Sequence, residues 1–479
     1  MKKFIFKNHL VIILLGGFIL RLFFYFFGAK VYYGKSDFFI GGDTSGWVTS
    51  ILNLINHGSY SIDLNEPTGY FFRPPGYSFF FGIFYLLSGK NLSVAYHLVV
   101  WAQLFMDVIS IWFIYDIVQR SFKNQLWSSI TAILYAAYPF VIVWTAIVYA
   151  ESTSVFLLLA GFWFFTNDKI KYHFFWSGIF IGIAALTRLQ ILFFLPAAII
   201  ALFFNYRNYF KTFLKTSIPF IVAFSISFGL WPARNYLLQG RLLFSQDLSA
   251  VACWDKDYMA FMDYIFSIKT DHQPQYSQMI NGEKVTWPKD SYIVPGDSEK
   301  LESVVKMCRT CGHGFSVFMK NEGLRKNDLP LDSSCSIQIA VIWNNLKENQ
   351  VKFNKANVYL WVPLNNFKKS IFKSDLYKPS SKIVSIVSTV LFGYRTIMIL
   401  LGLFGLLLYY RVKKEFPIIL KLIICYFFTW YFWNSFVYRN MEIRYLMQTD
   451  ILLLIPAAFC FVVMIEKYFL KKQKPERVS

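Results

Sequence analysis

The chain contains many long runs of apolar residues, and these runs restrict its possible folds more than any other feature. Leu10–Ala29 is the first of them, and similar runs recur as far as Phe469. A transmembrane helix needs about 20 consecutive apolar residues to cross a bilayer. With 56% hydrophobic and only 16% charged residues, the chain is also too apolar for a soluble globular protein. We therefore predict a polytopic, all-α membrane protein.

A bundle of about ten transmembrane helices is expected. No small-residue cleavage site follows Leu10–Ala29, so this run is predicted to remain as a helix rather than to be removed as a signal peptide. The apolar segment Tyr77–Leu87 has only about half the length of a span, and we expect a re-entrant or interfacial helix there. The predicted spans are Leu10–Ala29, Leu92–Val118, Leu126–Ile142, Thr153–Thr166, Phe175–Leu186, Leu189–Phe204, Phe213–Leu230, Ile383–Tyr410, Pro417–Phe436 and Leu446–Phe469.

The net charge of +20 is interpreted as a topology signal. The Lys and Arg residues form short clusters between apolar runs, as the positive-inside rule requires of cytoplasmic loops. If Tyr77–Leu87 does not span, the N-terminus, every short basic loop and the basic C-terminal tail all lie on the cytoplasmic side. The charge then indicates contact with anionic membrane lipids, and nucleic acid is not expected as a partner.

A polar stretch divides the chain into three predicted parts. Residues 1–231 form an N-terminal transmembrane module that includes a first outer loop at 30–91. Residues 232–382 are long and polar enough for an extracytoplasmic loop domain. Residues 383–479 hold the C-terminal transmembrane helices and the basic cytoplasmic tail.

The loop domain holds four of the six cysteines, namely Cys253, Cys308, Cys311 and Cys335. An even number of cysteines on an oxidising face predicts disulfides, and three pairings are possible. The Cys308-x-x-Cys311 spacing is also compatible with a zinc ligand pair or with redox exchange. Because no second such pair follows, disulfides are favoured, and neither a metal nor another cofactor is predicted.

Acidic and arginine residues recur where predicted spans meet the outer face. Asp43 follows the first span, and Arg73 begins an Arg-Pro-Pro-Gly turn. Arginines bind phosphate bidentately and stabilise the charge of a leaving phosphate, while a carboxylate can take a proton from an attacking hydroxyl. Transporters more often place charges near the bilayer midplane. The candidate site residues are Asp43, as catalytic base, with Arg73, Glu151, Arg188, Arg234, Arg444 and Tyr445.

Each candidate also has a structural alternative. Asp43 and Glu151 could cap the helices that follow them. Arg73 could anchor at lipid headgroups, and Arg188 could pair with a carboxylate. Arg234 and Arg444 lie beside aromatic residues that suit an interfacial belt. His57 and His97 are not predicted to bind a metal, because neither has a partner at metal-ligand spacing. Asp107 lies in mid-helix and is expected to make an interhelical contact, with Arg21 as a possible partner.

Several motifs occur in an order that resembles the GT-C glycosyltransferases. They are D-x-x-x-W from Asp43, R-P-P-G-Y from Arg73, Y-x-E ending at Glu151, G-I-A-A-L-T-R ending at Arg188, W-P-A-R-N-Y from Trp231 and E-x-R-Y from Glu442. More narrowly, they are similar to the bacterial branch related to protein O-mannosyltransferases and to the aminoarabinose transferase of lipid A. The resemblance covers roughly residues 21–240 and 438–456.

The resemblance implies a multi-helix bundle, a polyprenyl-phosphate sugar donor and inversion at the anomeric carbon. It implies that Asp43 is the base, that Arg73 contacts phosphate or acceptor, that Glu151 is a second acid and that Arg234 and Arg444 lie near the donor phosphate. Two departures exist. Thr44 stands where the mannosyltransferases have the second residue of an Asp-Glu pair, which argues against protein mannosylation. No proline closely follows the late Arg-Tyr pair.

The resulting hypothesis is an inverting glycosyltransferase of the bacterial inner membrane. It would move a single sugar from a polyprenyl phosphate to a hydroxyl of an envelope glycan or lipid on the extracytoplasmic face, with O-antigen or another lipopolysaccharide component as the favoured acceptor. Two alternatives stay open. A polysaccharide polymerase or ligase would use pyrophosphate-linked glycans, and a lipid-sugar flippase or transporter would depend on Asp107 and Arg21 rather than on Asp43.

Overall fold

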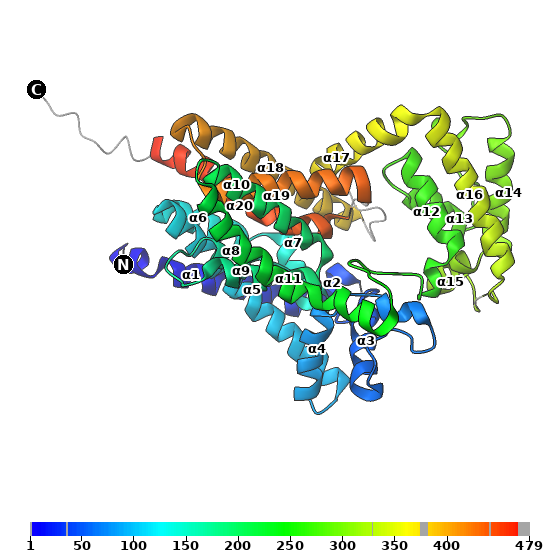
Figure 1. The fold of residues 1–479 in the computed structure, drawn as a ribbon, viewed down its shortest axis with the longest axis horizontal. Coiled ribbons are helices and arrows are strands. Elements are labelled where there is room, and N and C mark those ends of the chain that lie inside the picture. Colours follow the sequence, from blue (N-terminus) through cyan, green and yellow to red (C-terminus); the bar gives the residue numbers. More distant parts are fainter. Residues whose placement is uncertain (1, 35–36, 328, 374–381, 440–441, 468–479) are drawn as a thin grey trace, which may run out of the picture.

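The computed structural model describes residues 2–34, 37–327, 329–373, 382–439 and 442–467. Within these residues all regular elements are helices, which confirms the all-α class (Figure 1). The helices form an elongated bundle and a separate lobe. The predicted basic tail after Lys467 lies outside the described residues.

Seven helical segments of the described chain are long and apolar enough to cross a membrane. An eighth combines α6 (Gln125–Ala136) with Pro139–Ala146, and a bend of 51° separates its two parts. Two shorter apolar helices, α8 (Ala150–Phe165) and α9 (His173–Thr187), occupy the other two predicted spans, so the count of ten stays a prediction. The seven segments are Asn8–Tyr33 (most of α1, Lys2–Phe23, with α2, Ala29–Tyr33), Leu92–Phe122 (α5), Leu189–Tyr206 (with α10, Phe194–Tyr206), Phe210–Gln239 (α11), Val384–Lys413 (in α18, Lys382–Lys413), Ile418–Tyr438 (with α19, Ile418–Trp433) and Ile443–Ile465 (α20).

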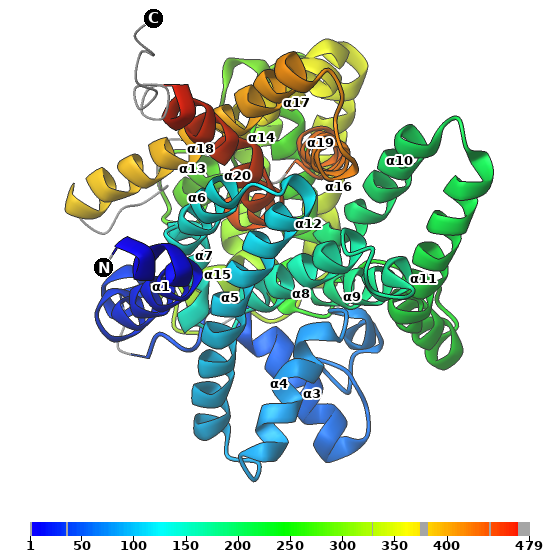
Figure 2. The same cartoon turned by 90° about the vertical axis from the view of Figure 1, so that its left-hand side faces the viewer.

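Two short helices follow the first span. The first, α3 (Thr44–His57), packs against α4 (Gly76–Leu87), and α4 in turn contacts α5 (Figure 2). With 12 residues, α4 is shorter than a span. Together α3 and α4 bury an apolar cluster around Trp47, Tyr77 and Phe81. This cluster fixes the loops at both ends of α3, where the candidate residues lie.

The helix α11 runs past the predicted domain boundary. It ends at Gln239, so Trp231 and Arg234 lie inside the helix rather than after it. Pro232 removes one backbone donor without ending the helix. The end comes at Gly240, whose φ of 64° is the left-handed conformation that glycine adopts most readily.

Two buried triads with the same chemistry join helices of the bundle. In the first, Arg21 Nε donates to Asp107 Oδ2 at 2.6 Å and Tyr135 donates to Asp107 Oδ1 at 2.6 Å. This confirms Arg21 as the partner of Asp107. The second triad consists of Arg395, Asp450 and Tyr431, with 2.7 Å between Arg395 Nε and Asp450 Oδ2. Each triad neutralises a charge that would be costly alone in the bundle.

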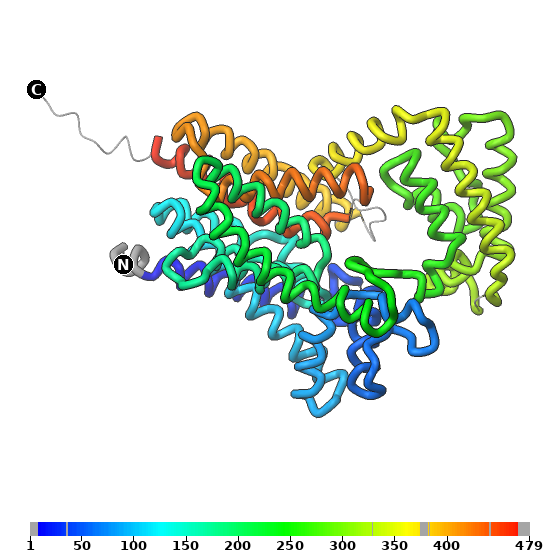
Figure 3. The backbone as a smooth tube through the Cα atoms, in the orientation of Figure 1, coloured from blue at the N-terminus to red at the C-terminus, as the bar shows by residue number. Residues whose placement is uncertain are grey.

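The polar lobe, defined here as residues 252–353, has its own hydrophobic core. Phe261, Tyr264 and Trp343 lie at its centre. The chain enters it from α11 and returns to the bundle through α17 (Val362–Phe372) (Figure 3). Its main helices are α12 (Lys256–Ile268), α13 (Gln273–Ile280), α14 (Asp297–Thr310), α15 (His313–Asn321) and α16 (Ser333–Phe353).

One disulfide, between Cys311 and Cys335, joins the α14–α15 turn to α16. Two of the four lobe cysteines thus form a disulfide of the predicted kind. Cys253 and Cys308 are free thiols, and burial raises the pKa of the Cys253 thiol to about 11. The Cys308 side chain lies inside the lobe core, where burial raises its pKa well above the ordinary value.

Candidate functional site

The Asp43 carboxylate is held between two arginines. Arg73 Nη2 donates to its Oδ1 at 2.7 Å, and Arg444 Nη1 donates to its Oδ2. Asp43 occupies the N-cap position of α3, but its side chain makes no capping hydrogen bond. Both carboxylate oxygens instead bind arginines that arrive from the Pro-Pro turn before α4 and from the start of α20. A cap role therefore does not explain the position of this carboxylate.

A second ion pair lies beside the first. The side chain of Glu151, at the start of α8, is fully buried and accepts a hydrogen bond from Arg188 Nη2. Arg444 Nη1 lies 3.8 Å from Glu151 Oε1, so Arg444 faces both acids. The structure thus brings together five predicted residues from five parts of the chain, namely Asp43, Arg73, Glu151, Arg188 and Arg444.

Tyr445 is a further predicted residue that joins the cluster, and its ring faces the guanidinium groups of Arg444 and Arg188. Its ring is 5.1 Å from the Arg444 guanidinium carbon and 6.0 Å from that of Arg188. Cation–π contacts of this kind hold guanidinium groups in place while leaving some of their N–H donors free. Indeed, the buried Nε atoms of Arg73 and Arg188 have no hydrogen-bond partner among the described residues. These donors are available to an added acceptor.

Three neighbours that the sequence did not assign to the site complete the cluster. Glu442 Oε2 lies 2.5 Å from Arg444 Nε, and the Trp47 ring lies 4.5 Å from the Arg73 guanidinium carbon. The Tyr149 hydroxyl accepts a hydrogen bond from the Asp43 backbone N–H at 3.0 Å. All three belong to the motifs quoted above, as the Glu of E-x-R-Y, the Trp of D-x-x-x-W and the Tyr of Y-x-E. The motif positions were therefore the signal that could have identified them.

The charges around Asp43 control its protonation. Burial raises the pKa of this carboxyl, but the positive charges of Arg73, Arg444 and Arg188 outweigh burial and hold the pKa well below its ordinary value. Asp43 is consequently ionised at neutral pH. With three arginines facing Asp43, Glu151 and Glu442, the formal charges of the cluster cancel. A phosphate that enters this cluster therefore has to compete with carboxylates for the guanidinium groups.

Arg234 lies elsewhere and has different partners. Its Nη1 donates to the backbone oxygen of Tyr70 and its Nη2 to that of Tyr60, each at 2.6 Å. Both carbonyls belong to the loop between α3 and α4. Arg234 thus ties α11 to the loop that leads into Arg73, and the structure does not place it in the arginine cluster.

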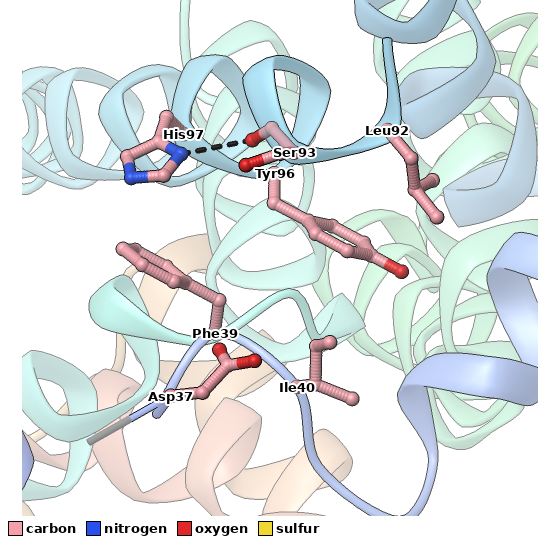
Figure 4. A pocket seen from close by; sticks show the side chains of 7 residues that line it. All are labelled: Asp37, Phe39, Ile40, Leu92, Ser93, Tyr96 and His97. Carbon is pink, nitrogen blue, oxygen red and sulfur yellow. Dashed lines mark hydrogen bonds between the residues drawn. The ribbon is translucent and has the colours of Figure 1, made fainter.

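The histidines predicted to lack a metal role do not join this cluster either. Among the described residues no group of three or more His, Cys, Asp or Glu side chains is placed to hold a metal ion. His97 instead lines an open hollow of about 610 Å³ with Asp37, Phe39 and Tyr96, next to the loop that leads to Asp43 (Figure 4). Its Nδ1 lies 2.8 Å from the Ser93 backbone oxygen.

Two solved structures are similar to this chain. The chain is similar to the oligosaccharyltransferase AglB from Archaeoglobus fulgidus, solved with an inhibitory peptide and a dolichol-phosphate, at a TM-score of 0.50 and 12% identity. The match covers 98% of this chain and 52% of AglB, so the chain spans about half the length of that protein. ArnT from Cupriavidus metallidurans, bound to undecaprenyl phosphate, matches at 12% identity and a TM-score of 0.37 over 91% of this chain and 77% of ArnT. No curated protein matches in sequence.

The likeness to AglB is one of fold. Residues 72–231 match the family described as dolichyl-phosphate-mannose-protein mannosyltransferase, and this region contains Arg73, Glu151 and Arg188. This region of the chain is therefore similar to that family. The resemblance inferred from the sequence is confirmed for the fold and for this region.

Proposed function

We propose that this protein is an inverting glycosyltransferase that moves a single sugar from a polyprenyl-phosphate donor to a hydroxyl of a cell-envelope glycan or lipid. The observation that carries the proposal is the Asp43 carboxylate held between Arg73 and Arg444 at one end of a membrane bundle. A donor anchored by a polyprenyl chain carries its phosphate at the bilayer surface and can reach such a site from the membrane. The dolichol-phosphate bound by AglB supports a lipid-phosphate donor.

In the proposed reaction, Asp43 takes the proton of the acceptor hydroxyl. The acceptor oxygen forms a bond to the anomeric carbon while the bond from that carbon to the phosphate oxygen breaks. The electron pair leaves on the polyprenyl phosphate, whose growing charge is stabilised by arginine. Attack on the side opposite to the phosphate inverts the anomeric centre, and no covalent enzyme intermediate is needed.

The ion pairs also suggest how the donor prepares the base. In the free protein, Arg73 and Arg444 make Asp43 a weak base because they lower its pKa. A donor phosphate attracts the same two guanidinium groups, which bind phosphate oxygens as well as they bind carboxylates. As they turn toward the phosphate, the pKa of Asp43 rises toward its ordinary value and the carboxylate becomes a stronger base. Proton abstraction is thereby coupled to donor binding.

The proposed location is the bacterial inner membrane, with the site on the extracytoplasmic face. The charge pattern of the loops supports this orientation. O-antigen or another lipopolysaccharide component is the favoured acceptor.

The test compares purified lipopolysaccharide from cells that express the wild type, Asp43→Asn or Glu66→Gln, by mass spectrometry. Glu66 is an exposed acid of the same loop, so its variant controls for the loss of one charge. We expect one hexose-type or pentose-type mass increment with the wild type and the control, and none with Asp43→Asn. An equal increment with Asp43→Asn would exclude Asp43 as the base.

A second measurement separates the alternative donors. Purified protein is offered either a polyprenyl-phosphate sugar or an oligosaccharide-pyrophosphate lipid. Transfer from the first donor alone supports the proposal, whereas transfer from the second alone would indicate a polymerase or ligase.

A further inference from the structure

A second basic site lies where the polar lobe meets the bundle. Lys269 at the end of α12 and Lys368 and Lys369 on α17 line a hollow of about 370 Å³. Asp290 contributes the one carboxylate of its lining, so the lining carries a net formal charge of +2. None of the catalytic candidates belongs to this hollow.

The three lysines have few partners of opposite charge. Between residues that the structure describes, no ion pair involves Lys269, Lys368 or Lys369. Lys269 Nζ donates to the neutral side chain of Gln275 at 2.6 Å. Burial lowers the pKa of Lys269; the charge of Asp271 opposes this shift, and the charge of Lys369 adds to it. Bringing like charges together in this way is unfavourable unless an anion joins them.

A neutral donor also points to a missing partner. The Asn357 side chain lines the same hollow, and its buried Nδ2 has no hydrogen-bond partner among the described residues. An amide N–H and three ammonium groups are all donors, and Lys ammonium groups accept no hydrogen bond. The hollow therefore favours a ligand rich in acceptor oxygens, such as a phosphate group.

The position of α17 along the bundle fixes the level of the hollow in the membrane. About 20 residues of helix cross the hydrocarbon core. Counting back from the basic end of α18 at Arg411, the opposite boundary therefore falls near Leu391. About one helical turn on the hydrocarbon side of this point, Arg395 Nη1 donates to Ser370 O at 2.7 Å and Thr396 Oγ1 donates to Ile371 O at 2.8 Å. The last turn of α17 therefore lies within about one helical turn of the boundary, and the long side chains of Lys368 and Lys369 can reach the headgroups from there.

Exposed apolar side chains beside the hollow agree with this level. Trp361 is 57% exposed, and Tyr359, Leu360, Leu364 and Phe372 are also exposed. Aromatic and aliphatic side chains next to lysines are typical of segments that lie in the headgroup region. A soluble anion would leave this apolar surface uncovered, whereas the acyl chains of a lipid would cover it.

From this geometry we propose that Lys269, Lys368, Lys369 and Asn357 form a binding site for the phosphate headgroup of an anionic membrane lipid, on the same side of the membrane as Asp43. The lipid would fill the joint between the polar lobe and the bundle. Arg439 also links the two parts, since it donates to Phe266 O at 3.1 Å and to Val358 O at 2.8 Å. The proposal does not depend on the transfer reaction.

Native mass spectrometry of the detergent-purified protein tests the site, with phosphatidylglycerol as the anionic probe and phosphatidylcholine as the zwitterionic one. The pocket variant is Lys269→Gln/Lys368→Gln/Lys369→Gln. The control variant, Lys256→Gln/Lys284→Gln/Lys306→Gln, removes the same charge from exposed positions of the polar lobe. Because juxtamembrane lysines contribute strongly to the binding of anionic lipids, we expect about tenfold weaker phosphatidylglycerol binding in the pocket variant only.

Unchanged phosphatidylglycerol binding in the pocket variant, or equal losses in both variants, would overturn the proposal. The source of the phosphate is tested by competition. If millimolar inorganic phosphate fails to displace phosphatidylglycerol from the wild type, a lipid headgroup is supported. Complete displacement would show that the site prefers a soluble anion. An unchanged thermal transition of the pocket variant is expected, because Lys368 and Lys369 are exposed and a glutamine at position 269 keeps a donor for Gln275.

Discussion

The Arg21–Asp107 pair offers a stability prediction that also separates a structural role from a transport role. Both side chains are fully buried, and 2.6 Å separates Arg21 Nε from Asp107 Oδ2. Removing one partner of a buried ion pair leaves an uncompensated charge and typically costs about 3–5 kcal/mol. We therefore expect Asp107→Asn, which keeps an acceptor for Tyr135, to lower the free energy of unfolding by about this amount, and Arg21→Met to do the same.

The double variant is the informative one. Arg21→Met/Asp107→Asn leaves no buried charge, and replacing a buried pair by neutral residues of similar volume is often close to neutral. Its loss should therefore stay well below the sum of the two single losses. Interhelical hydrogen bonds in membranes average only about 0.6 kcal/mol. A coupling above ~2 kcal/mol would consequently identify charge neutralisation, rather than the hydrogen bonds, as the main contribution.

The assay is equilibrium unfolding in mixed micelles, followed by the fluorescence of the 14 tryptophans. Sugar transfer is measured on each variant that remains folded. We expect the double variant to retain transfer. The reasoning would be refuted by a loss below ~1 kcal/mol for Asp107→Asn, because a buried unpaired charge costs more than that. A stable double variant without function would instead favour the flippase alternative. The same series at Arg395 and Asp450 serves as an independent repeat.

Three further predictions concern the site and the lobe. The folded-state pKa of Asp43 is depressed, so the carboxylate stays ionised and its contribution to stability is lost only as the pH falls below the ordinary carboxyl range. The pH profile of kcat/KM should therefore show no acid limb from Asp43 between pH 5 and 8. An acid limb in that window that disappears in Asp43→Asn would contradict this prediction. Arg234→Gln should lower the free energy of unfolding by about 1–3 kcal/mol, because it removes hydrogen bonds to two loop carbonyls, and it should leave the donor KM of the folded fraction unchanged. Arg73→Gln should raise the donor KM. An equal rise in both variants would indicate that Arg234 also binds the donor. Non-reducing peptide mapping should find Cys311 linked to Cys335 and, in the native protein, no maleimide label on buried Cys308; a Cys308 crosslink would refute the assignment.

The helical bundle and the Arg21–Asp107 contact could be predicted because they depend on local patterns. Apolar runs are visible along the chain, and a charged residue in mid-span needs a partner of opposite charge at a similar depth. The end of α11, by contrast, could not be placed correctly from the sequence. Trp231-Pro232 resembles a helix end, but the helix tolerates the proline and continues to Gly240. The predicted count of ten spans also stays a prediction, because α8 and α9 are too short to be assigned as spans by length alone.

The residues of the candidate site could be predicted from the sequence, but their ion-pair partners could be predicted only in part. Motif order indicated that Asp43, Arg73 and Arg444 lie at the same end of the bundle. Which arginine binds which acid depends on side-chain positions that no local pattern specifies. Arg234 illustrates this limit, since its motif suited phosphate binding while its guanidinium binds two loop carbonyls. The same holds for the cysteines, because a disulfide depends on Cα separations that the spacing of cysteines does not reveal.

The bond between Arg444 and Asp43 joins residues 401 positions apart. Ribosomes add about 5–20 residues per second, so roughly 20–80 seconds of translation separate the two residues. During that interval Asp43 and Arg73 are already in the membrane while the partner that completes the cluster has not been made. If the proposed function is right, a nascent chain that still lacks α20 cannot carry out transfer, because the cluster closes only when α20 inserts. Activity itself would then report that α20 has inserted.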